Sequence, residues 1–470
     1  MKAKATPGLL WLMIAVYIAF FGIVTALRHA HFQTQAWDMG IFDQLYWNLL
    51  HGNGFSSSIE ELPRHFGIHM SPTLLLLAPL YALFPSPYFL LFIQTAALGF
   101  AAWPLFLLAR NALHNEKAAL SVAAAYLLYP ALHWINLYDF HEIALYVPAA
   151  IAAFYCIEEA CWGWATFFLL LAAGTKEDAI LGIFFIGTYV LFKKSAGGAD
   201  SARRRIFGVA AAAVAIAYFL LSIKVLMPAF GGGLLRLDRY AHLGNSFSEI
   251  AKNSVSNPAL MFSTIFTPPK ISYLFWLFLP TAFLPLMAPS SLLLLLPGIP
   301  ENLLTNFSAQ FSGLYQYDAI LIPGIFIGTI FGLKYLLRTF PRFEKNILRL
   351  FLGFALAGCI LRSPINPAFF PKGLSGPDSK RDAYQAMIAA VPPKASVAAN
   401  TNLVPHLTHR ALIAQLGAER FQPDFILIDG ADSFGFENDD RFNAYFDRYA
   451  NSGLYDTSVI EDRYALLKRK

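Results

Sequence analysis

Long runs of apolar residues, separated by short polar stretches, cover the first 362 residues of this chain. About eleven of these runs are predicted to be membrane-spanning helices, because a bilayer core requires about 20 consecutive apolar residues in an α-helix. Several runs are shorter than that, above all the pairs within 163–192 and 272–304, and their assignment is the weakest. The runs are 9–27, 88–109, 118–136, 143–159, 163–175, 178–192, 206–227, 272–288, 290–304, 317–336 and 346–362.

The composition supports an integral membrane protein. Hydrophobic residues make up 57% of the chain and charged residues only 14%, with a mean hydropathy of +0.50, whereas soluble domains carry roughly 25% charged residues. The net charge of +5 arises from basic residues in short loops between apolar runs, which indicates membrane topology rather than nucleic-acid binding. The lipid bilayer is therefore an expected partner, and a nucleic acid is not.

Clusters of basic residues predict which loops face the cytoplasm, because cytoplasmic loops carry an excess of Lys and Arg. One cluster lies within 193–205 and another within 334–349, and the N-terminus adds Lys2 and Lys4. The apolar segment 71–85 is short and contains three prolines. If it spanned the membrane, the cluster at 193–205 would lie outside, so we predict that it forms a surface or re-entrant helix.

This arrangement predicts a multi-pass protein of the plasma (inner) membrane with a cytoplasmic N-terminus. The run 9–27 is interpreted as a retained helix rather than a signal peptide, because it is about long enough to span and no small-x-small cleavage site follows. Loop 28–87, with surface helices, and loop 228–271 then face outside. One feature opposes the scheme: Glu158 and Glu159 fall on the cytoplasmic side with no basic residue near them in the sequence.

Residues 363–470 are predicted to form a separate soluble domain on the extracytoplasmic side. Prolines and glycines after residue 363 indicate a linker, the stretch 379–390 indicates a helix, and Ala395–Ala399 and Phe425–Asp429 indicate buried strands. About 100 residues suffice for a small α/β domain. The predicted fold is thus an all-α polytopic membrane bundle over residues 1–362 with a small α/β domain after it.

Two carboxylates, Asp38 and Asp43, begin the first outer loop beside several aromatic residues. Ionisable groups next to hydrocarbon are costly and are usually functional. Gly40 lies between them and favours a turn that could direct both towards one point, as a general base or a metal-binding pair. The alternative is structural, with Asp38 as the N-terminal cap of a helix over 41–50.

A second polar cluster, Asp139, His141 and Glu142, is predicted on the same outer face. It offers three oxygen or nitrogen ligands within four residues, a set that could bind a divalent cation or position a hydroxyl. The structural alternative is a polar loop between two helices in which Asp139 caps the next helix. His141 alone is more often a hydrogen-bonded interface histidine than a ligand.

A third cluster, Lys176, Glu177 and Asp178, lies at a junction between two apolar runs. Lys176 could hold a phosphate as a compact cation, with the two acids as its partners. The alternative is a solvated turn in which the three charges face water.

The outer loops add further candidates for binding. His65 and His69 are four residues apart, so one helical face could present both, but a zinc site would need a third ligand. The loops at 228–271 and 305–318 add Arg236 and Tyr317. The sequence contains no GxGxxG, Walker A, HExxH or GxSxG pattern, so nucleotide hydrolysis and serine or zinc hydrolysis lack support.

The order of these motifs resembles the DUF2079 family of predicted polytopic membrane proteins. The layout is also similar to the GT-C superfamily of integral membrane glycosyltransferases, with a first helix, an acidic outer loop with surface helices, and a Thr-Lys-Glu-Asp junction between helices. The resemblance covers essentially the whole chain. The stretches that carry it are Asp38–Gln44, His69–Tyr81, Asp139–Glu142, Thr175–Asp178 and Asn402–His406.

The resemblance to GT-C implies an inverting transfer of a sugar from a polyprenyl-phosphate donor to a glycan, lipid or protein acceptor, outside the cytoplasm. In that superfamily an acidic residue of the first outer loop deprotonates the acceptor, a place that Asp38 matches best and Asp43 second. Some of its members hold a divalent metal between acids of two outer loops, so Mg²⁺ or Mn²⁺ is a candidate cofactor. The acids that could hold such an ion here are Asp139, Glu142, Glu177 and Asp178.

The residues expected to bind substrate or phosphate are Lys176, His69, His141, Arg236 and Tyr317, with Lys176 placed at the donor phosphate. A base must approach the acceptor hydroxyl within roughly 3 Å, and the charge on the departing phosphate must be stabilised. The competing hypothesis is a transporter or flippase of a lipid-linked or polar envelope precursor. Such a protein would place charges at mid-membrane on broken, repeated helices, whereas here they cluster at the ends of apolar runs.

Overall fold

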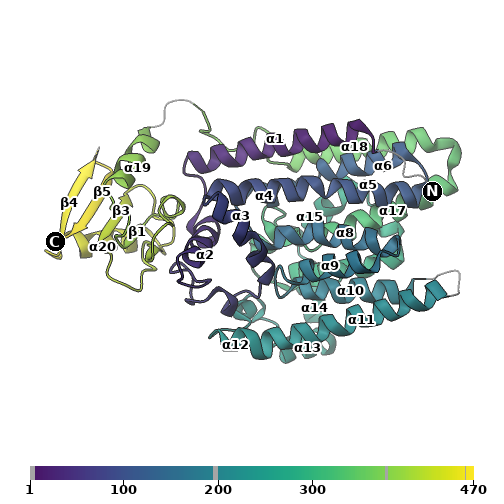
Figure 1. Ribbon diagram of the computed structural model, residues 1–470, viewed down its shortest axis with the longest axis horizontal. Helices are drawn as coiled ribbons and strands as arrows, with labels where there is room; N and C mark the ends of the chain where they lie inside the picture. Colours follow the sequence, from purple (N-terminus) through teal and green to yellow (C-terminus); the bar gives the residue numbers. More distant parts are fainter. Residues whose placement is uncertain (1–5, 194–198, 376–378, 461) are drawn as a thin grey trace.

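The computed structural model describes the chain except for residues 1–5, 194–198, 376–378 and 461. Of the predicted topology signals, Lys2, Lys4 and Lys194 fall outside the described part. Most of that part is helical, and a sheet lies at one end of the helical bundle (Figure 1). The start of α1 (Gly8–Ala30) lies at the opposite end from the strands.

Fewer helices are long enough to cross a bilayer than the sequence predicted. Within the described residues, three helical segments are both long and apolar enough: Gly8–Ala30, Pro87–Leu113 and Ser201–Ala229, with 23, 27 and 29 residues. A fourth results if Glu116–Leu127 and Pro130–Leu137, which meet at 42°, form one bent span. By length and composition, the prediction of about eleven spans is therefore wrong.

Some of the predicted spans are missing because their helices end early. The runs at 163–175 and 178–192 form α9 (Trp162–Ala173) and α10 (Ala179–Phe192), of 12 and 14 residues. At 1.5 Å per residue these helices are about 18 and 21 Å long, against about 30 Å for the hydrocarbon core of a bilayer. Each is apolar along most of its length but too short to span upright.

Prolines interrupt the two predicted spans within 272–304. Within 272–304 the chain forms α15 (Pro268–Phe278), then a series of 3-10 turns, and then α16 (Gly298–Leu304). The 3-10 turns carry Pro280, Pro285 and Pro289 at their first or second positions. Proline has no N–H to donate and its ring clashes with the preceding turn, so a continuous helix cannot form there.

The remaining helices complete the bundle and its loops. α10 and α11 (Ala199–Leu221) pack closely because Gly187 and Gly208 face each other, and a Cβ on Gly187 would lie 2.8 Å from the carbonyl oxygen of Gly208.

The other helices of the bundle and its loops are α2 (Ile41–Leu50), α3 (Ala78–Leu83), α4 (Pro87–Phe100), α5 (Ala102–Leu113), α6 (Glu116–Leu127), α7 (Pro130–Leu137), α8 (Tyr146–Glu158), α12 (Met227–Ala229), α13 (Phe247–Ser256), α14 (Pro258–Ile265), α17 (Ile322–Thr339) and α18 (Glu344–Arg362).

The segment 71–85 is too short to span, in agreement with its prediction as a surface or re-entrant element. It forms a 3-10 turn, Pro72–Leu77, that leads into α3. Thr73 donates its backbone N–H to the carbonyl of Gly174 at 2.8 Å, which ties the segment to the junction of α9 and α10. Tyr81, at the other end, is fully buried.

The polar and the basic loops lie at opposite ends of the bundle (Figure 1). The loops after α1, α7 and α9 lie at the end that carries the sheet, and the α10–α11 and α17–α18 connections lie at the far end. At that far end Lys193 forms an ion pair with Glu158, and Arg204 donates to the backbone oxygen of Glu158 at 2.9 Å. The acidic residue that opposed the predicted topology therefore has basic partners.

The C-terminal module, residues 379–470, contains a five-stranded sheet of order β2-β1-β3-β5-β4. The strands β1, β2 and β3 are parallel, whereas β5 runs antiparallel to both β3 and β4. Strand β3 matches its predicted bounds and β1 is shorter than predicted. The elements are α19 (Ser379–Ala389), β1 (Val397–Ala399), β2 (Ile413–Gln415), β3 (Phe425–Asp429), α20 (Asp439–Ala450), β4 (Tyr455–Ile460) and β5 (Tyr464–Arg469).

The two faces of this sheet bury different partners. Side chains alternate along a strand, so Ala398 and Ile426 face α20, within a cluster confined to the module. Their neighbours Val397, Phe425 and Leu427 face a cluster that also contains residues of the first loop region. The largest of these residues of the loop region include Phe32, Met39, Phe42, Tyr46 and Tyr81.

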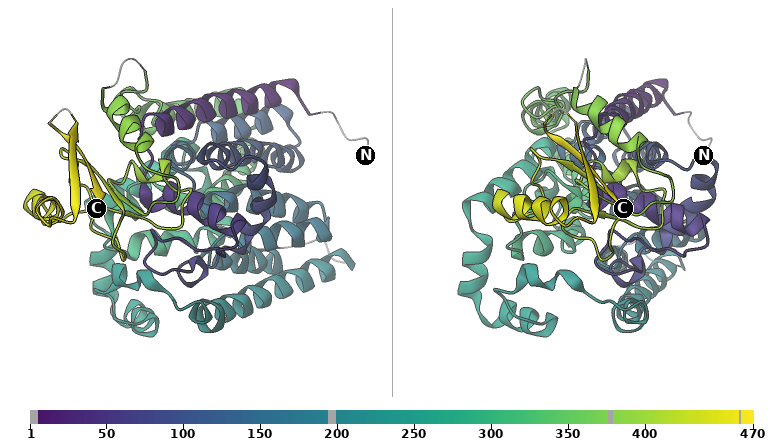
Figure 2. Two further views of the ribbon diagram at one scale, coloured as in Figure 1. Left: turned by 60° about the vertical axis from the view of Figure 1, so that its left-hand side comes forward. Right: turned by 90° about the vertical axis from the view of Figure 1, so that its left-hand side faces the viewer.

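The module is therefore attached to the bundle by a shared hydrophobic core. It lies over the end of the bundle rather than along its side (Figure 2). The division of the chain at residue 362 follows the end of α18, but a separate soluble domain stays a prediction. One face of the sheet packs against α19, the segment 403–407 and residues of loop 28–87 together.

The shared core gives a prediction about stability. Leu403 is fully buried within it, and Leu403→Ala should destabilise the protein by about 2–5 kcal/mol, the usual cost of truncating a buried leucine. The melting temperature of the purified protein in detergent measures this effect. Leu412→Ala, at a side chain that is 43% exposed, is the matched control and should change stability by less than about 0.5 kcal/mol. Equal melting temperatures for both variants would contradict the shared core.

Candidate functional site

A cavity of about 440 Å³ lies at the sheet end of the bundle, between loops that are far apart in the sequence. The loop between α1 and α2 contributes Trp37 and Asp38, and the turn after α7 contributes His141 and Glu142. Lys176 joins them from the α9–α10 junction. The loops before α13 and α17 complete the wall with Arg236, Arg239, Tyr315 and Tyr317. Three polar clusters predicted to share one face therefore meet in one cavity.

Asp38 lies in a single π-helical turn, Ala36–Gly40, directly before α2. α2 begins without a side-chain cap, so the alternative interpretation of Asp38 as an N-terminal cap is wrong. Its Oδ1 forms an ion pair with Nε2 of the buried His141 at 2.8 Å. Burial lowers the pKa of His141, but the negative charges of Asp38, Glu142 and Asp139 outweigh it and raise the pKa overall. The imidazolium is thus favoured beside the Asp38 carboxylate.

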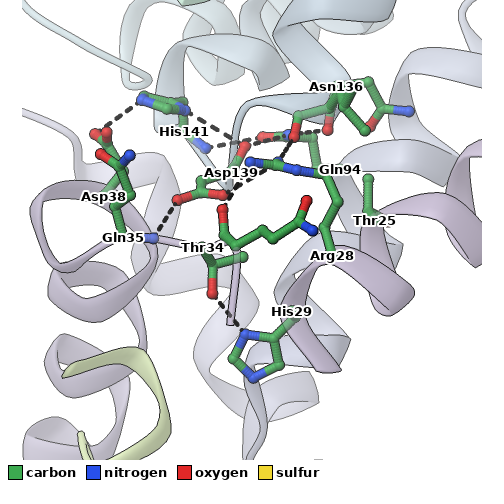
Figure 3. Close-up of polar contacts among 12 residues, drawn as sticks. Thr25, Arg28, His29, Thr34, Gln35, Asp38, Gln94, Asn136, Asp139 and His141 are labelled. Atoms are coloured by element: carbon green, nitrogen blue, oxygen red, sulfur yellow. Dashed lines mark hydrogen bonds and ion pairs between the residues drawn. The ribbon is translucent and has the colours of Figure 1, made fainter. Parts of the chain in front are cut away.

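A buried network behind the cavity fixes the turn that carries His141 (Figure 3). Gln94, on α4, donates to the backbone oxygen of Asp139 at 2.7 Å and accepts the N–H of His141 at 2.8 Å. The Asp139 carboxylate accepts the N–H of Gln35 at 2.9 Å and pairs with Arg28 at 3.5 Å. These contacts connect α1, α4 and the α7 turn, and so fix the direction of the His141 ring.

Asp139 is held in an unfavourable state by this network. Its φ of 118° is rare for a residue with a side chain. Burial raises the pKa of its carboxyl to about 7, although the positive charge of Arg28 opposes the shift. Asp139 does not cap a helix, since the 3-10 turn Glu142–Leu145 has no side-chain cap. Its role is to hold the turn, and it does not line the cavity.

A second histidine–carboxylate pair lies at the cavity, with His69 among its lining residues. His69 Nδ1 lies 2.9 Å from Glu177 Oε1, and Glu177 Oε2 accepts the N–H of Met70 at 3.0 Å. Lys176 pairs with Asp178 at 3.4 Å. Burial lowers the pKa of Lys176, but Asp178 and the other carboxylates around it raise it well above its usual range, so Lys176 is an ammonium.

An apolar groove of about 340 Å³ adjoins the cavity. Its walls include Leu181 and Phe185 of α10, Phe219 of α11, and Phe247 and Ile250 of α13. The cavity and the groove share six residues, which mark the junction between them: Ile68, His69, Lys176, Arg236, Arg239 and Tyr317. The polar site therefore continues directly into an apolar channel, with cationic side chains at the junction.

Asp43 does not line the cavity. It is fully buried at the contact with the C-terminal module, where it accepts the hydroxyl of Tyr81 at 2.6 Å and the hydroxyl of Thr408. His409 Nε2 lies 3.1 Å from its second oxygen. Asp43 therefore joins α2 to the module, and the two carboxylates that the sequence presented as a pair point to different places.

The four acids expected to hold a divalent cation do not meet at one point. Glu142 lines the cavity and Asp139 lies behind it, whereas Glu177 and Asp178 line the groove. Within the part of the chain that the structure describes, no three His, Cys, Asp or Glu side chains are arranged to hold a metal ion. The predicted metal ligands thus gain no support from their geometry.

Six of the predicted catalytic and substrate-binding residues line the cavity, and their roles stay predictions. His69, His141, Lys176, Arg236 and Tyr317 all line the cavity, as does Asp38. His65 lies beside them but bonds to Glu60 and to Ser71, and so does not pair with His69 in a ligand set.

Sequence reasoning missed Arg28 and Gln94. A signal existed for Gln94, which is a buried amide within the apolar run 88–109, and polar residues in spanning helices are usually functional. Arg28 ends the first helix and would be assigned to the membrane interface by default. Its pairing with Asp139, 111 residues later, is visible only in the fold.

The chain belongs to the DUF2079 family, described as predicted membrane proteins, which matches residues 28–466. This confirms the family resemblance drawn from the motifs. No curated protein matches the sequence.

The buried state of Asp139 predicts a pH effect on stability. Its raised pKa means that the folded state binds a proton more tightly than the unfolded state, so stability decreases as the pH rises from about 4 to about 7. Asp139→Asn cannot ionise and should lack this contribution. The melting temperature of the variant, relative to that of the wild type, should therefore increase from pH 5 to pH 8. A constant difference across this range would contradict the raised pKa.

Proposed function

We propose that this DUF2079 protein is a GT-C-like glycosyltransferase that moves a sugar from a polyprenyl-phosphate donor to an acceptor hydroxyl on the extracytoplasmic face. The observation that carries the proposal is a polar cavity, containing a carboxylate, that opens into an apolar groove with cations at the junction. A lipid-linked sugar has the same division, with a polar head and a long hydrocarbon tail.

The junction suits a phosphate. Lys176, Arg236 and Arg239 line both compartments. The Arg239 guanidinium lies 4.3 Å from the centre of the Phe307 ring and bonds to the hydroxyl of Tyr317 at 3.5 Å, which holds it in place. Charged donors bind phosphate strongly, and fixed cations stabilise the negative charge that develops on a departing phosphate.

The polar cavity suits the sugar and its acceptor. Trp37, Tyr138 and Tyr315 supply rigid, amphipathic surfaces, and the Tyr138 ring stacks on His141 with centroids 5.3 Å apart. Asp38 uses Oδ1 for His141 and keeps 17% of its side chain exposed, so a hydroxyl can approach the carboxylate. The ion pair with His141 holds this carboxylate in one orientation.

The reaction follows from this placement. The acceptor oxygen attacks the anomeric carbon of the sugar, and the bond from that carbon to the phosphate oxygen breaks with its electron pair on the phosphate. Asp38 takes the proton of the acceptor hydroxyl. Attack from the side opposite the phosphate inverts the configuration at the anomeric carbon.

Asp38→Asn should remove transfer, because an amide cannot accept the proton. We expect a decrease in kcat of about 10²-fold or more, measured with purified protein, a panel of radiolabelled polyprenyl-phosphate hexoses and pentoses, and a lipid or glycan acceptor. Mass spectrometry of glycans from cells with and without the protein identifies the sugar to use. Asp440→Asn, at an exposed position of α20, is the matched control and should keep full activity.

Two results would decide against this assignment. Full transfer by Asp38→Asn would exclude Asp38 as the base. Movement of intact labelled lipid across vesicle membranes, without any transferred sugar, would instead favour the competing transporter or flippase hypothesis.

The proposed orientation has a separate test. If the basic end of the bundle faces the cytoplasm, the C-terminal module lies outside. Alkaline phosphatase, which is active only outside the cytoplasm, should therefore be active when fused after Lys470. A fluorescent protein that folds only in the cytoplasm should stay dark at the same position. The opposite pair of results would place the cavity on the cytoplasmic side.

A further inference from the structure

His69 has the geometry of an oriented proton-transfer group. Its Nδ1 lies 2.9 Å from Glu177 Oε1, and Glu177 is itself fixed by the backbone N–H of Met70. Glu177 is buried, whereas the His69 side chain is 23% exposed. A carboxylate that accepts the proton of one ring nitrogen sets both the ring orientation and the tautomer.

The second ring nitrogen of His69 therefore remains for a ligand. In the described part of the chain, Nε2 makes no hydrogen bond with a protein group, and His69 lines both the cavity and the groove. Asp38 lines the cavity but not the groove. Asp38 is thus confined to the cavity, whereas His69 lies at its junction with the groove.

Charged groups from several segments lie near the His69 ring. Three carboxylates lie near the ring, on the 3-10 turn after α7 and at the α9–α10 junction. The basic groups near it are Lys176 and His65, and Arg236 and Arg239 line the same junction of cavity and groove. The three carboxylates are Glu177, Glu142 and Asp178. Burial raises the pKa of Glu177, but the charge of His69 and its hydrogen bond lower it to about 2, so Glu177 stays ionised.

We propose that His69 is the catalytic acid at the donor phosphate and that Glu177 is its positioning residue. This inference rests on the proposed glycosyl transfer. As the bond between the anomeric carbon and the phosphate oxygen breaks, its electron pair stays on that oxygen, and the imidazolium of His69 transfers its Nε2 proton there. Asp38 meanwhile receives the acceptor proton. Both groups return to their starting states by proton exchange with water.

His69→Gln tests the acid. With the radiolabelled polyprenyl-phosphate sugar that the wild type uses, kcat should decrease about 10²-fold or more. KM for the donor should change less than threefold, because Lys176, Arg236 and Arg239 remain to bind the phosphate. The alkaline limb of the kcat–pH profile, which reports loss of the acidic proton, should disappear. His51→Gln, at an exposed histidine away from the cavity, is the matched control and should retain wild-type kinetics.

Glu177→Gln tests the positioning role. The variant keeps an acceptor for the N–H of Met70 but loses the charge beside the imidazolium, so the alkaline limb should shift to lower pH by about one unit. A decrease in kcat that is equal at all pH values in both variants would indicate a structural role only and would overturn the proposal. The melting temperatures of the variants report whether they fold.

The outcomes separate this inference from the proposed function. If the wild type transfers sugar and His69→Gln keeps kcat within threefold, the acid assignment alone fails. If the wild type transfers sugar from no polyprenyl-phosphate donor in the panel, the proposed function fails, and the acid assignment fails with it.

Discussion

Charges that lie beside hydrocarbon must find partners inside the protein, and this constraint organises the whole sheet end of the molecule. Isolated buried charges are strongly disfavoured, so Asp139 pairs with Arg28, Glu177 with His69, and Lys176 with Asp178. Each pair joins segments that would otherwise be independent, or fixes a junction between two helices. His69 and Lys176 line the cavity directly, whereas the pair of Asp139 and Arg28 supports from behind the turn that carries His141.

The C-terminal module is subject to the same constraint. Asp43 would be an uncompensated charge in the core that α2 shares with the module, were it not for the hydroxyls of Tyr81 and Thr408 and the ring of His409. The turn before it is fixed as well, since Thr401 accepts the N–H of Ala36 at 3.2 Å. Asp38 belongs to this turn, so the module supports the proposed base from behind without entering the cavity.

The local part of this site could be predicted from sequence, and the pairing could not. Charged residues at the ends of apolar runs stand out in any hydropathy pattern, and the basic loops identified the shared face of Asp38, His141 and Lys176. Partner choice depends on distant segments: Asp43 and Thr408 are 365 positions apart, and no local pattern shows that Asp43 faces the module. The prediction of about eleven spans was wrong for a related reason: the apolar composition of a run does not reveal where proline or a charged turn ends the helix.

The short lengths of α9 and α10 bear directly on where the site lies. α9 and α10 are about 18 and 21 Å long, less than the about 30 Å of a bilayer core. The junction between them must therefore lie deeper than the ends of the long spans if the far ends are level. At this junction Lys176 and Glu177 line the apolar groove, together with His69 and the arginines of the loop before α13. The proposed transfer requires this arrangement, because a cation must lie beside the phosphate of a lipid whose tail would occupy the groove.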